Sequence, residues 1–358
     1  MSGDGLRWFP TEGALKGSML QTKRGALTEQ EAREIKVFLR PVMVGIVSCK
    51  RVKIDGPVFQ NPPAWTLHPL MSEDVTIAHV RVFNDEWAAN ADALDVESCR
   101  NVIIYNCLFD AGDDAITMKS GRNEEGRKRG MPTENVLVSG CVVYSGHGGF
   151  VVGSEMSGGV RNIDVKHCTF IGTDNGLRFK STRGRGGVVE NIFISDVNMI
   201  NIRQDAILYD LYYMVRDKGK GPIPPVDEGT PQFKNISMKN IVCKGARRAV
   251  LLQGLPEMTL KNISMENVSI EAATGIYCSD AESIKMKNIH IQTPAQTVME
   301  IVDATKLEFD GFSFNETAAN GVQISGEKTA DIVFHNSKFS PGKVKIGNEV
   351  KAGSVTIK

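Results

Sequence analysis

The 358-residue sequence lacks any run of about 18 apolar residues, the length that a helix needs to cross a bilayer. We therefore expect no membrane span. The N-terminal residues MSGDGLRWFPTEG also lack the apolar stretch of a secretory signal peptide. The formal net charge is zero, because 42 Lys and Arg residues balance 42 Asp and Glu residues. Whole-chain charge therefore gives no sign of a nucleic-acid partner.

The seven cysteines include no Cys-x-x-Cys pair, which argues against zinc sites and thioredoxin-like chemistry. Because seven is odd, at least one thiol lies outside any intramolecular disulfide. Cys107, Cys141 and Cys168 each stand five residues after an apolar anchor of the repeat described next. We interpret them as stacked core residues, since a thiol packs as a small apolar group.

The main feature that is present is a repeat. Each copy has two apolar residues separated by one, a polar break and a second short apolar stretch, as in SCRNVIIYNCLF and GVRNIDVKHCTF. Period-2 alternation rich in β-branched residues predicts strands. The copies lie 21 to 44 residues apart, mostly 21 to 29, which is typical of a solenoid, and the Leu-x-x-Leu-x-Leu pattern of leucine-rich repeats is absent. The anchors are Val52, Val75, Val102, Val136, Ile163, Ile192, Ile236, Ile263, Ile284, Leu307 and Ile332.

An asparagine precedes the anchor in six consecutive repeats. Asn accepts the left-handed backbone conformation at turns, so stacked copies predict an asparagine ladder. We therefore predict an all-β fold, a parallel β-helix, as a single domain over residues 1–358 with rungs from about 41 to 345. Residues 1–40 show no clear rung, although LTEQEAREIK is compatible with a short helix after Thr28. The asparagines are Asn101, Asn135, Asn162, Asn191, Asn235 and Asn262.

A second strand in each repeat aligns polar residues. Aligning these strands on the small residue that precedes the apolar one predicts two vertical columns, with neighbouring rungs about 4.7–4.9 Å apart. Arg178 and Lys180 lie one rung further on, at strand positions that face the same way. The first column is Asp92, Asp114, Gly148, Asn175 and Asp205, and the second is Asp113, His147, Asp174 and Gln204.

Such a column can perform acid–base chemistry. Carboxylates this close repel one another, so at least one pKa should rise and leave a protonated acid beside ionised partners. Glycosidic cleavage needs that combination: an acid for the leaving oxygen and a base for water. Alternatively, the carboxylates bind calcium through their oxygens. Each motif alone is more typical of a turn, a loop or a solvated face, and the functional interpretation depends on their falling in register.

At these residues the sequence resembles the polygalacturonase family, glycoside hydrolase family 28. The family's Asn-Thr-Asp, Gly-Asp-Asp, Gly-His-Gly and Arg-Ile-Lys motifs correspond here to 90–92, 112–114, 146–148 and 178–180. The resemblance covers roughly residues 41–300. Ala91 replaces the Thr of the first motif, and no catalytic group is missing. The resemblance implies a right-handed, pectin-lyase-like solenoid, preceded in the family by earlier rungs, so that residues 1–40 correspond to a truncated N-terminus.

The resemblance also implies roles for individual residues. Asp113 would be the general acid, Asp92 and Asp114 would activate water with inversion, and His147 would support the acid. The implied substrate-binding residues are Arg178 and Lys180 for the galacturonate carboxylate, Tyr213 or Tyr212 near the leaving group, and Asn90. No cofactor and no metal are implied.

Two segments resemble insertions of exo-acting bacterial members: NPPAWTLHP at 61–69 and SGRNEEGRKRGMPTEN at 120–135. A long basic turn from Arg122 to Pro132 is expected to wall off one end of the cleft and to meet the terminal sugar. The implied partner is a pectic polysaccharide or oligogalacturonide, bound by a monomer that is periplasmic or secreted. The local positive charge, which suits a polyanion, comes from Arg122, Arg127, Lys128, Arg129, Arg183 and Arg185.

Two other functions are compatible with the predicted fold. A pectate-lyase-like enzyme would abstract a proton with Arg or Lys beside calcium and would not need the paired Gly-Asp-Asp and Gly-His-Gly motifs. A non-catalytic carbohydrate-binding β-helix would bind oligogalacturonate without releasing reducing ends. The linkage and the neighbouring sugar, galacturonan or rhamnogalacturonan, remain open at this point.

Overall fold

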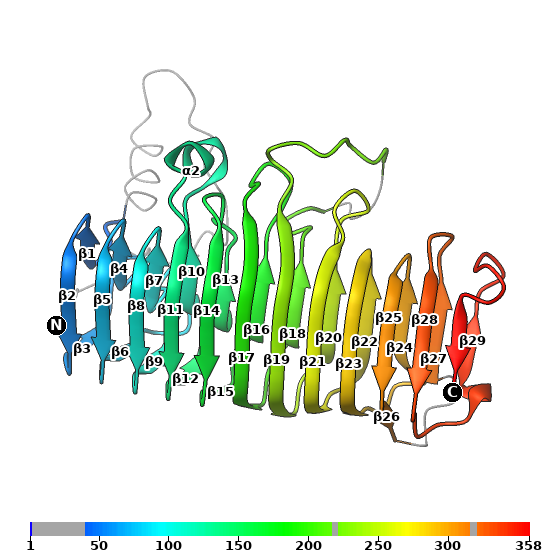
Figure 1. Ribbon diagram of the computed structural model, residues 1–358. Helices are drawn as coiled ribbons and strands as arrows, with labels where there is room; N and C mark the ends of the chain where they lie inside the picture. The colour runs from blue at the N-terminus through cyan, green and yellow to red at the C-terminus, as the bar shows by residue number, and fades with distance from the viewer. Residues whose placement is uncertain (2–39, 217–220, 316–320) are drawn as a thin grey trace, which may run out of the picture.

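The protein is described by a computed structural model over residues 1, 40–216, 221–315 and 321–358. Strands stack side by side along one axis, with the N-terminal strands at one end and the C-terminal strands at the other (Figure 1). All pairings between the named strands are parallel and join successive coils of the chain, for example β1 with β4 and β4 with β7. This architecture confirms the predicted right-handed parallel β-helix. The expected helix after Thr28 lies outside the described residues.

The first sheet contains twelve strands in the described residues, in the order in which the chain visits them. Its strands are short, and most of their residues are buried on both faces. They are β1 (Val44–Val47), β4 (Leu67–Leu70), β7 (Leu94–Glu97), β10 (Asp114–Lys119), β13 (Gly148–Val152), β16 (Asn175–Lys180), β18 (Asp205–Asp210), β20 (Arg248–Gln253), β22 (Thr274–Ser279), β24 (Thr297–Val302), β27 (Gly321–Ser325) and β29 (Val344–Ile346).

The remaining strands form an eighteen-stranded sheet within the described part of the chain. In several coils two short strands fuse into one long strand. Its members are β2 (Lys50–Asp55), β3 (Val58–Gln60), β5 (Glu73–Ala78), β6 (Arg81–Phe83), β8 (Arg100–Tyr105), β9 (Leu108–Asp110), β11 (Thr133–Ser139), β12 (Val142–Ser145), β14 (Val160–Lys166), β15 (Thr169–Ile171), β17 (Val188–Ile200), β19 (Gln232–Lys244), β21 (Leu260–Glu271), β23 (Ala281–Gln292), β25 (Thr305–Asp310), β26 (Ser313–Phe314), β28 (Ala330–His335) and β30 (Val355–Ile357).

The predicted register is confirmed in this second sheet. Val52 pairs with Val75, Val75 with Val102, and Val102 with Val136, and the later anchors continue the same column. Their side chains face the core and are nearly all fully buried, which stabilises the fold by roughly 1.5–3 kcal/mol for each such side chain. The paired strands continue past the expected end at residue 345, because β30 pairs with β28.

The asparagine ladder is also confirmed. Asn135 donates to Asn101, Asn162 to Asn135 and Asn191 to Asn162, at 3.2–3.3 Å, and Asn262 donates to Asn235. All six asparagines have φ values between 53° and 57°, as the left-handed turn requires. A second ladder, not predicted from the sequence, lies at the next turn, where hydrogen bonds run from Asn288 through Asn267 and Asn240 to Asp196.

The interior confirms the interpretation of the cysteines. Cys107, Cys141 and Cys168 are buried and unpaired, and all seven thiols are free. Aromatic rings stack along the same axis: Phe179 and Tyr209 lie 4.3 Å apart in parallel planes. Such stacking follows from the fold, because equivalent positions of successive rungs lie directly above one another.

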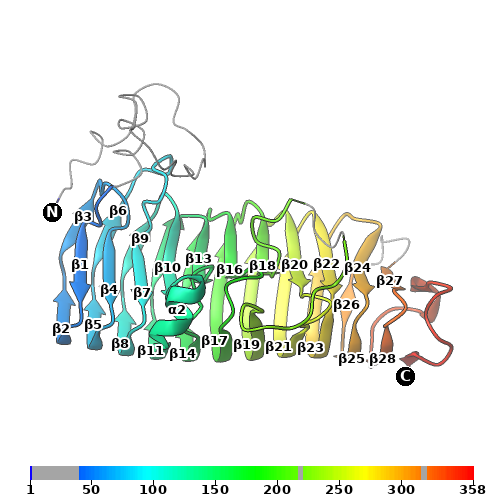
Figure 2. The ribbon, with the colours of Figure 1, turned by 90° about the horizontal axis from the view of Figure 1, so that it is seen from above.

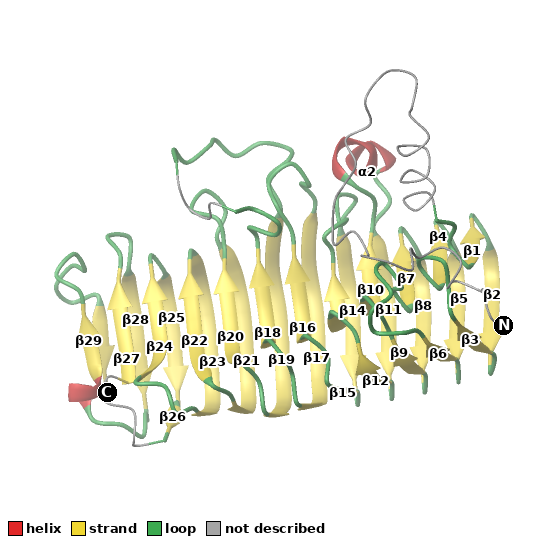
Figure 3. Cartoon of the chain, turned by 180° about the vertical axis from the view of Figure 1, so that it is seen from behind, coloured by secondary structure: helices red, strands yellow, loops and turns green. Residues whose placement is uncertain are grey.

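The turn expected from Arg122 to Pro132 contains a helix instead. Helix α2 (Asn123–Arg129) lies beside strands β10 and β13 (Figure 2). Figure 3 shows it in red. Glu124 and Glu125 lie in its first turn and three basic residues in its last, which complements the helix dipole. Gly130, at φ 59°, closes the helix by donating to the Gly126 carbonyl. No described helix has the length and apolar character to span a membrane.

Candidate active site

Three aspartates meet where neighbouring strands of the twelve-stranded sheet begin. Asp92 lies in the turn before β7, Asp113 directly before β10, and Asp114 is the first residue of β10. One oxygen of each carboxylate lies within 4.8 Å of an oxygen of the other two. Asp92 and Asp114 are 3% and 1% exposed, so little solvent screens their interaction. The predicted first column thus exists, with Asp114 beside Gly148 and Gly148 beside Asn175.

Asp114 is held by two cations from β16. The Arg178 guanidinium donates to Oδ1 at 2.8 Å and the Lys180 ammonium to Oδ2 at 2.6 Å. Burial raises the pKa of Asp114, but Lys180 and Arg178 outweigh it and hold this pKa well below its usual range. Asp114 is therefore an ionised carboxylate whose two oxygens are both engaged.

His147 pairs with Asp113. Its Nδ1 lies 2.9 Å from Asp113 Oδ1, and its Nε2 lies 3.9 Å from Asp174. The hydrogen bond to Asp113 raises the pKa of His147 against the opposing effect of partial burial. Burial raises the pKa of Asp113, yet the bond to His147 leaves it below its usual value. The sequence predicted both residues and their contact, and it predicted Asp174 in the same column.

Asp92 behaves in the opposite way. Burial, reinforced by the carboxylates of Asp95 and Asp113, raises its pKa well above the usual range. Burial likewise raises the pKa of Asp95 to about 6. The expected rise in pKa is present in this cluster, but it falls on Asp92 and on its neighbour Asp95 rather than on Asp113.

Two glycines make this geometry possible. A Cβ on Gly148 would lie 3.2 Å from Arg178 Cδ and 2.5 Å from a methyl of Val151, so only glycine lets Arg178 cross the rung to Asp114. A Cβ on Gly112 would lie 2.3 Å from the Ala88 carbonyl oxygen, so the loop before Asp92 packs directly on the Gly-Asp-Asp turn.

The other predicted residues lie at the same place. The Tyr213 ring covers Arg178 and Lys180, with centroid distances of 5.7 Å and 5.0 Å. Tyr212 is buried beside Arg183, so Tyr213 is the tyrosine that lies at the site. Asn90 accepts a hydrogen bond from Arg40 at 2.9 Å.

The basic residues around α2 are engaged by protein groups. Arg127 donates to the Gly184 carbonyl and pairs with Glu228, and Arg129 binds Glu97. Lys128 pairs with Glu124 along the helix. These contacts fix α2 to the neighbouring loops, and the expected contact of Arg127, Lys128 and Arg129 with a sugar carboxylate gains no support from them.

A further layer of charge, not predicted from the sequence, lies under the aspartates. Lys119, the last residue of β10, lies 3.4 Å from Asp95, 3.2 Å from Glu155 and 4.7 Å from the centre of the Trp65 ring. The sequence did contain a signal for Lys119: side chains alternate along β10, and this strand starts at Asp114 and ends at Lys119. Glu155 follows β13 in a loop, where no periodicity predicts its direction.

The three aspartates have the spacing that a cation site requires. Calcium, however, takes six to eight oxygen ligands, and both oxygens of Asp114 already accept hydrogen bonds from cations. The donor set therefore fits acid–base chemistry better than metal coordination.

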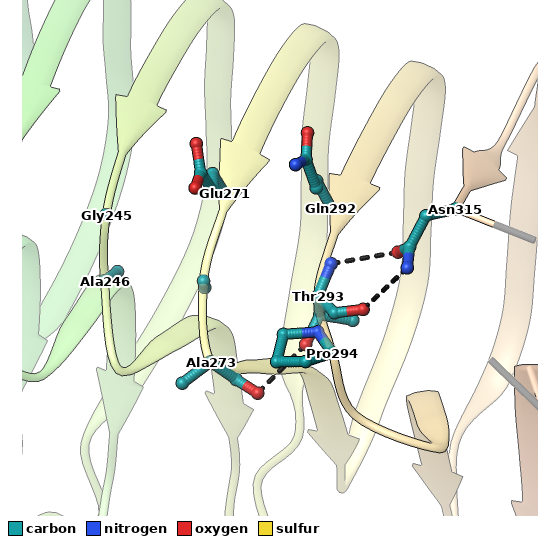
Figure 4. A pocket seen from close by; sticks show the side chains of 9 residues that line it. Gly245, Ala246, Glu271, Ala273, Gln292, Thr293, Pro294 and Asn315 are labelled. Atoms are coloured by element: carbon teal, nitrogen blue, oxygen red, sulfur yellow. Dashed lines mark hydrogen bonds between the residues drawn. The ribbon is translucent and has the colours of Figure 1, made fainter. Parts of the chain in front are cut away.

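A hollow of about 500 Å³ lies on the same row of turns, several rungs toward the C-terminus (Figure 4). Its nine lining residues include one carboxylate, Glu271, and no basic side chain. Thr293 and Asn315 satisfy each other there through hydrogen bonds of 2.8–2.9 Å. Without a second carboxylate, this hollow lacks the groups for glycosidic cleavage.

Fold and site together define a parallel β-helix with a glycosidase-type cluster of carboxylates. The family Glycosyl hydrolases family 28 matches residues 16–295, and the chain belongs to this family. A probable polygalacturonase from Vitis vinifera is 26% identical over 253 residues, covering 69% of this chain and 50% of that protein. An exo-poly-alpha-D-galacturonosidase from Dickeya chrysanthemi is 24% identical over 70% of this chain and 42% of its own length.

Among solved structures, a hyperthermoactive exopolygalacturonase from Thermotoga maritima superposes with a TM-score of 0.69 at 31% identity. The alignment covers 81% of this chain and 66% of that one. The chain spans about half the length, or less, of the curated relatives that it matches.

Proposed function

We propose that the protein is a glycosidase that hydrolyses bonds to α-linked galacturonic acid in pectin. The observation that carries the proposal is the buried cluster of Asp92, Asp113 and Asp114, with His147 on one side and two cations on the other. Membership of family 28 supports it, as do the names of the polygalacturonases that the chain resembles.

In this proposal Asp113 protonates the leaving oxygen, while Asp92 and the ionised Asp114 activate water. Asp113 must first receive a proton, because its bond to His147 lowers its pKa. We infer that Asp113 takes this proton from solvent on Oδ2, the oxygen that His147 does not contact, and gives it from there to the glycosidic oxygen. His147 Nδ1, 2.9 Å from Oδ1, stays hydrogen-bonded to the acid throughout.

The same cations bind the substrate carboxylate in this proposal. Arg178 keeps N–H donors beyond the one given to Asp114, and its side chain is 13% exposed. Tyr213 covers both cations and offers an aromatic face to a sugar ring. Asn90 borders the site through Arg40. A planar guanidinium suits a carboxylate, which favours galacturonate over neutral galactose.

Inversion at the anomeric carbon rests on the resemblance to the family. Inverting enzymes usually hold their two carboxyl groups about 6.5–9.5 Å apart, whereas oxygens of this cluster lie within 4.8 Å of one another. Proton NMR of the first product decides: the β-anomer from an α-linkage supports inversion, and the α-anomer contradicts it.

Exo cleavage is the proposed mode of action. Segment 61–69 places Trp65 two residues before the start of β4, the strand next to β7, and the Trp65 ring covers Lys119 in β10. The next backbone N–H, of Thr66, donates to the Asp92 carbonyl at 2.9 Å. An aromatic residue is thus fixed one rung before the aspartates, where it can close one end of a groove.

The partner in this proposal is a pectic polysaccharide, galacturonan or rhamnogalacturonan, acted on by a periplasmic or secreted monomer. Polygalacturonate digestion tests the function. Hydrolysis releases reducing ends without unsaturated products. Ultraviolet-absorbing unsaturated ends would indicate a lyase, and binding without any cleavage would indicate a non-catalytic β-helix. Mass spectrometry of defined oligogalacturonides and rhamnogalacturonan identifies the linkage and the neighbouring sugar.

A further inference from the structure

Lys119 is a buried ammonium beneath the aspartate cluster. Its side chain is 5% exposed. The Nζ atom lies 3.2 Å from Glu155 Oε2, 3.4 Å from Asp95 Oδ1 and 3.9 Å from Asp92 Oδ2. The Trp65 ring covers it on another side, 4.7 Å away. Three carboxylates and one aromatic face, from different segments of the chain, therefore converge on a single cation.

This arrangement keeps Lys119 charged. Burial alone would lower the pKa of a lysine, but Glu155, Asp95 and Asp92 raise it well above the ordinary value. Glu155 is ionised as well: burial raises its pKa, and Lys119, Lys180 and Arg185 together bring it down to about 2. Lys119 and Glu155 thus form a fixed ion pair below the site, and the position of the cation does not depend on the protonation of Asp92.

Asp92 depends on this cation. Four charged groups act on its carboxylate, and three of them are carboxylates, namely Asp95, Asp113 and Asp114. Lys119 is the one that opposes them. Asp92 Oδ1 is buried and has no hydrogen-bond partner within the described part of the chain. Asp114, by contrast, has two cations in direct contact.

Asp95 is part of the same balance. It is fully buried in β7, facing Lys119 and Asp92, and His68 of β4 acts on it from the preceding rung. His68 itself is bound to Glu97 at 3.0 Å. Lys119 is therefore the close cation near the Asp92–Asp95 pair, while several carboxylates surround it.

We propose that Lys119 is a positioning residue for Asp92: it holds the Asp92 carboxylate beneath the reacting water and favours its ionised form. The proposal rests on the proposed function, in which Asp92 accepts a proton from water. Its consequence is that Lys119 sets the acidic limb of the pH–rate profile, since kcat/KM reports the free enzyme's essential base.

The test compares the pH dependence of kcat/KM on polygalacturonate for the intact protein and for Lys119→Met, which removes the charge and keeps the length. The acidic limb should move to higher pH by about one pH unit or more, with a loss of ~10-fold at about pH 4.5 and a far smaller loss at about pH 7.5. Lys285→Met, which changes an exposed lysine on the other sheet, is the control and should leave the profile unchanged.

Changes at Asp95 make the test specific. Asp95→Asn alone removes a carboxylate that opposes ionisation of Asp92, so the acidic limb should move to lower pH. The double variant Lys119→Met/Asp95→Asn should return most of the way to the wild-type profile. If Lys119→Met instead lowers the rate by the same factor at every pH, and Asp95→Asn does not restore it, Lys119 is a purely structural residue and the proposal is wrong.

A second readout does not depend on activity. Without Lys119, ionisation of Asp92 and Asp95 costs more in the folded state, so the melting temperature of Lys119→Met should fall more steeply than that of wild type between about pH 5 and pH 8. Parallel curves would overturn the proposal. A wild-type protein that cleaves no pectic substrate would contradict the proposed function, while this stability comparison would still decide the role of Lys119. Should Lys119→Met not fold, Lys119→Gln, which also removes the charge, replaces it in both measurements.

Discussion

Asp92 and Asp114 occupy the same column on adjacent rungs, yet their neighbours drive their pKa values in opposite directions. Asp114 accepts from Arg178 and Lys180, which hold its pKa low despite burial. Asp92 is buried beside Asp95, which contributes to raising its pKa. The surroundings therefore shift the pKa values of two chemically identical side chains in opposite directions, a pattern typical of paired acid and base groups.

Asp92→Asn should change stability in a pH-dependent way. Because the pKa of Asp92 is raised in the folded state, its contribution is favourable while the group is protonated and is lost as the pH rises through that value. A folded-state pKa that lies one pH unit from the unfolded-state pKa corresponds to roughly 1.4 kcal/mol of stability. Melting temperatures should therefore show Asp92→Asn gaining stability relative to wild type at neutral pH and gaining little at about pH 4. Equal changes at both pH values would contradict the raised pKa.

Arg178→Ala and Lys180→Ala should weaken recognition of galacturonate more than recognition of neutral galactose oligomers. A hydrogen bond to a charged group contributes roughly 1.5–3 kcal/mol, which corresponds to a rise of about 10- to 100-fold in KM or Kd. Lys285→Ala, which changes an exposed lysine on the other sheet, serves as the control. Equal losses on both substrates would show that the two cations act only through Asp114.

At the scale of elements, strands were predictable and loops were not. Period-2 alternation identified the anchor strands, and parallel stacking then carried Asp114, Gly148 and Asn175 into one column. The helix α2 was missed because Asn123–Arg129 lacks the apolar periodicity that marks a helix; its charges complement the dipole, and ion pairs to neighbouring loops hold it. Lys119 was overlooked because a lysine at the end of a strand is usually exposed to solvent. Only the structure shows that the segment containing Trp65 covers it.

Trp65→Ala tests the role of segment 61–69. If the Trp65 ring closes one end of the groove, its removal should change the early products of polygalacturonate digestion from monomer toward dimers and longer oligomers. Viscosity should then fall faster for each bond cleaved. Phe193→Ala, at an exposed position on the other sheet, is the matched control. If Trp65→Ala still releases only monomer, Trp65 does not close the groove. If the wild-type protein itself releases mixed oligomers, exo action is contradicted.

At the scale of the whole molecule, the β-helix builds the site by stacking. Asp92, Asp113, His147 and Arg178 come from four successive rungs, and the inter-rung spacing alone brings them together. For this reason the sequence predicted the location of the site. It did not predict that the raised pKa would fall on Asp92, because that depends on burial by segments from other coils.

Dialysis against a chelator should leave activity unchanged. Carboxylate hydrolysis needs no Lewis acid, and Arg178 and Lys180 already neutralise Asp114. The measurement is the initial rate on polygalacturonate before dialysis, after dialysis and after calcium is added back. A sharp loss that calcium restores would favour the lyase alternative.

The most direct measurement of the central claim is the release of reducing ends from polygalacturonate by the wild-type protein and by Asp113→Asn, side by side. The substitution keeps the shape of the side chain but removes its ability to deliver a proton, which is worth on the order of 10²–10⁴-fold in rate. We expect steady release by wild type and a loss of that size in the variant, with unchanged circular dichroism. A variant that retains more than about a tenth of the wild-type rate would show that Asp113 is not the acid.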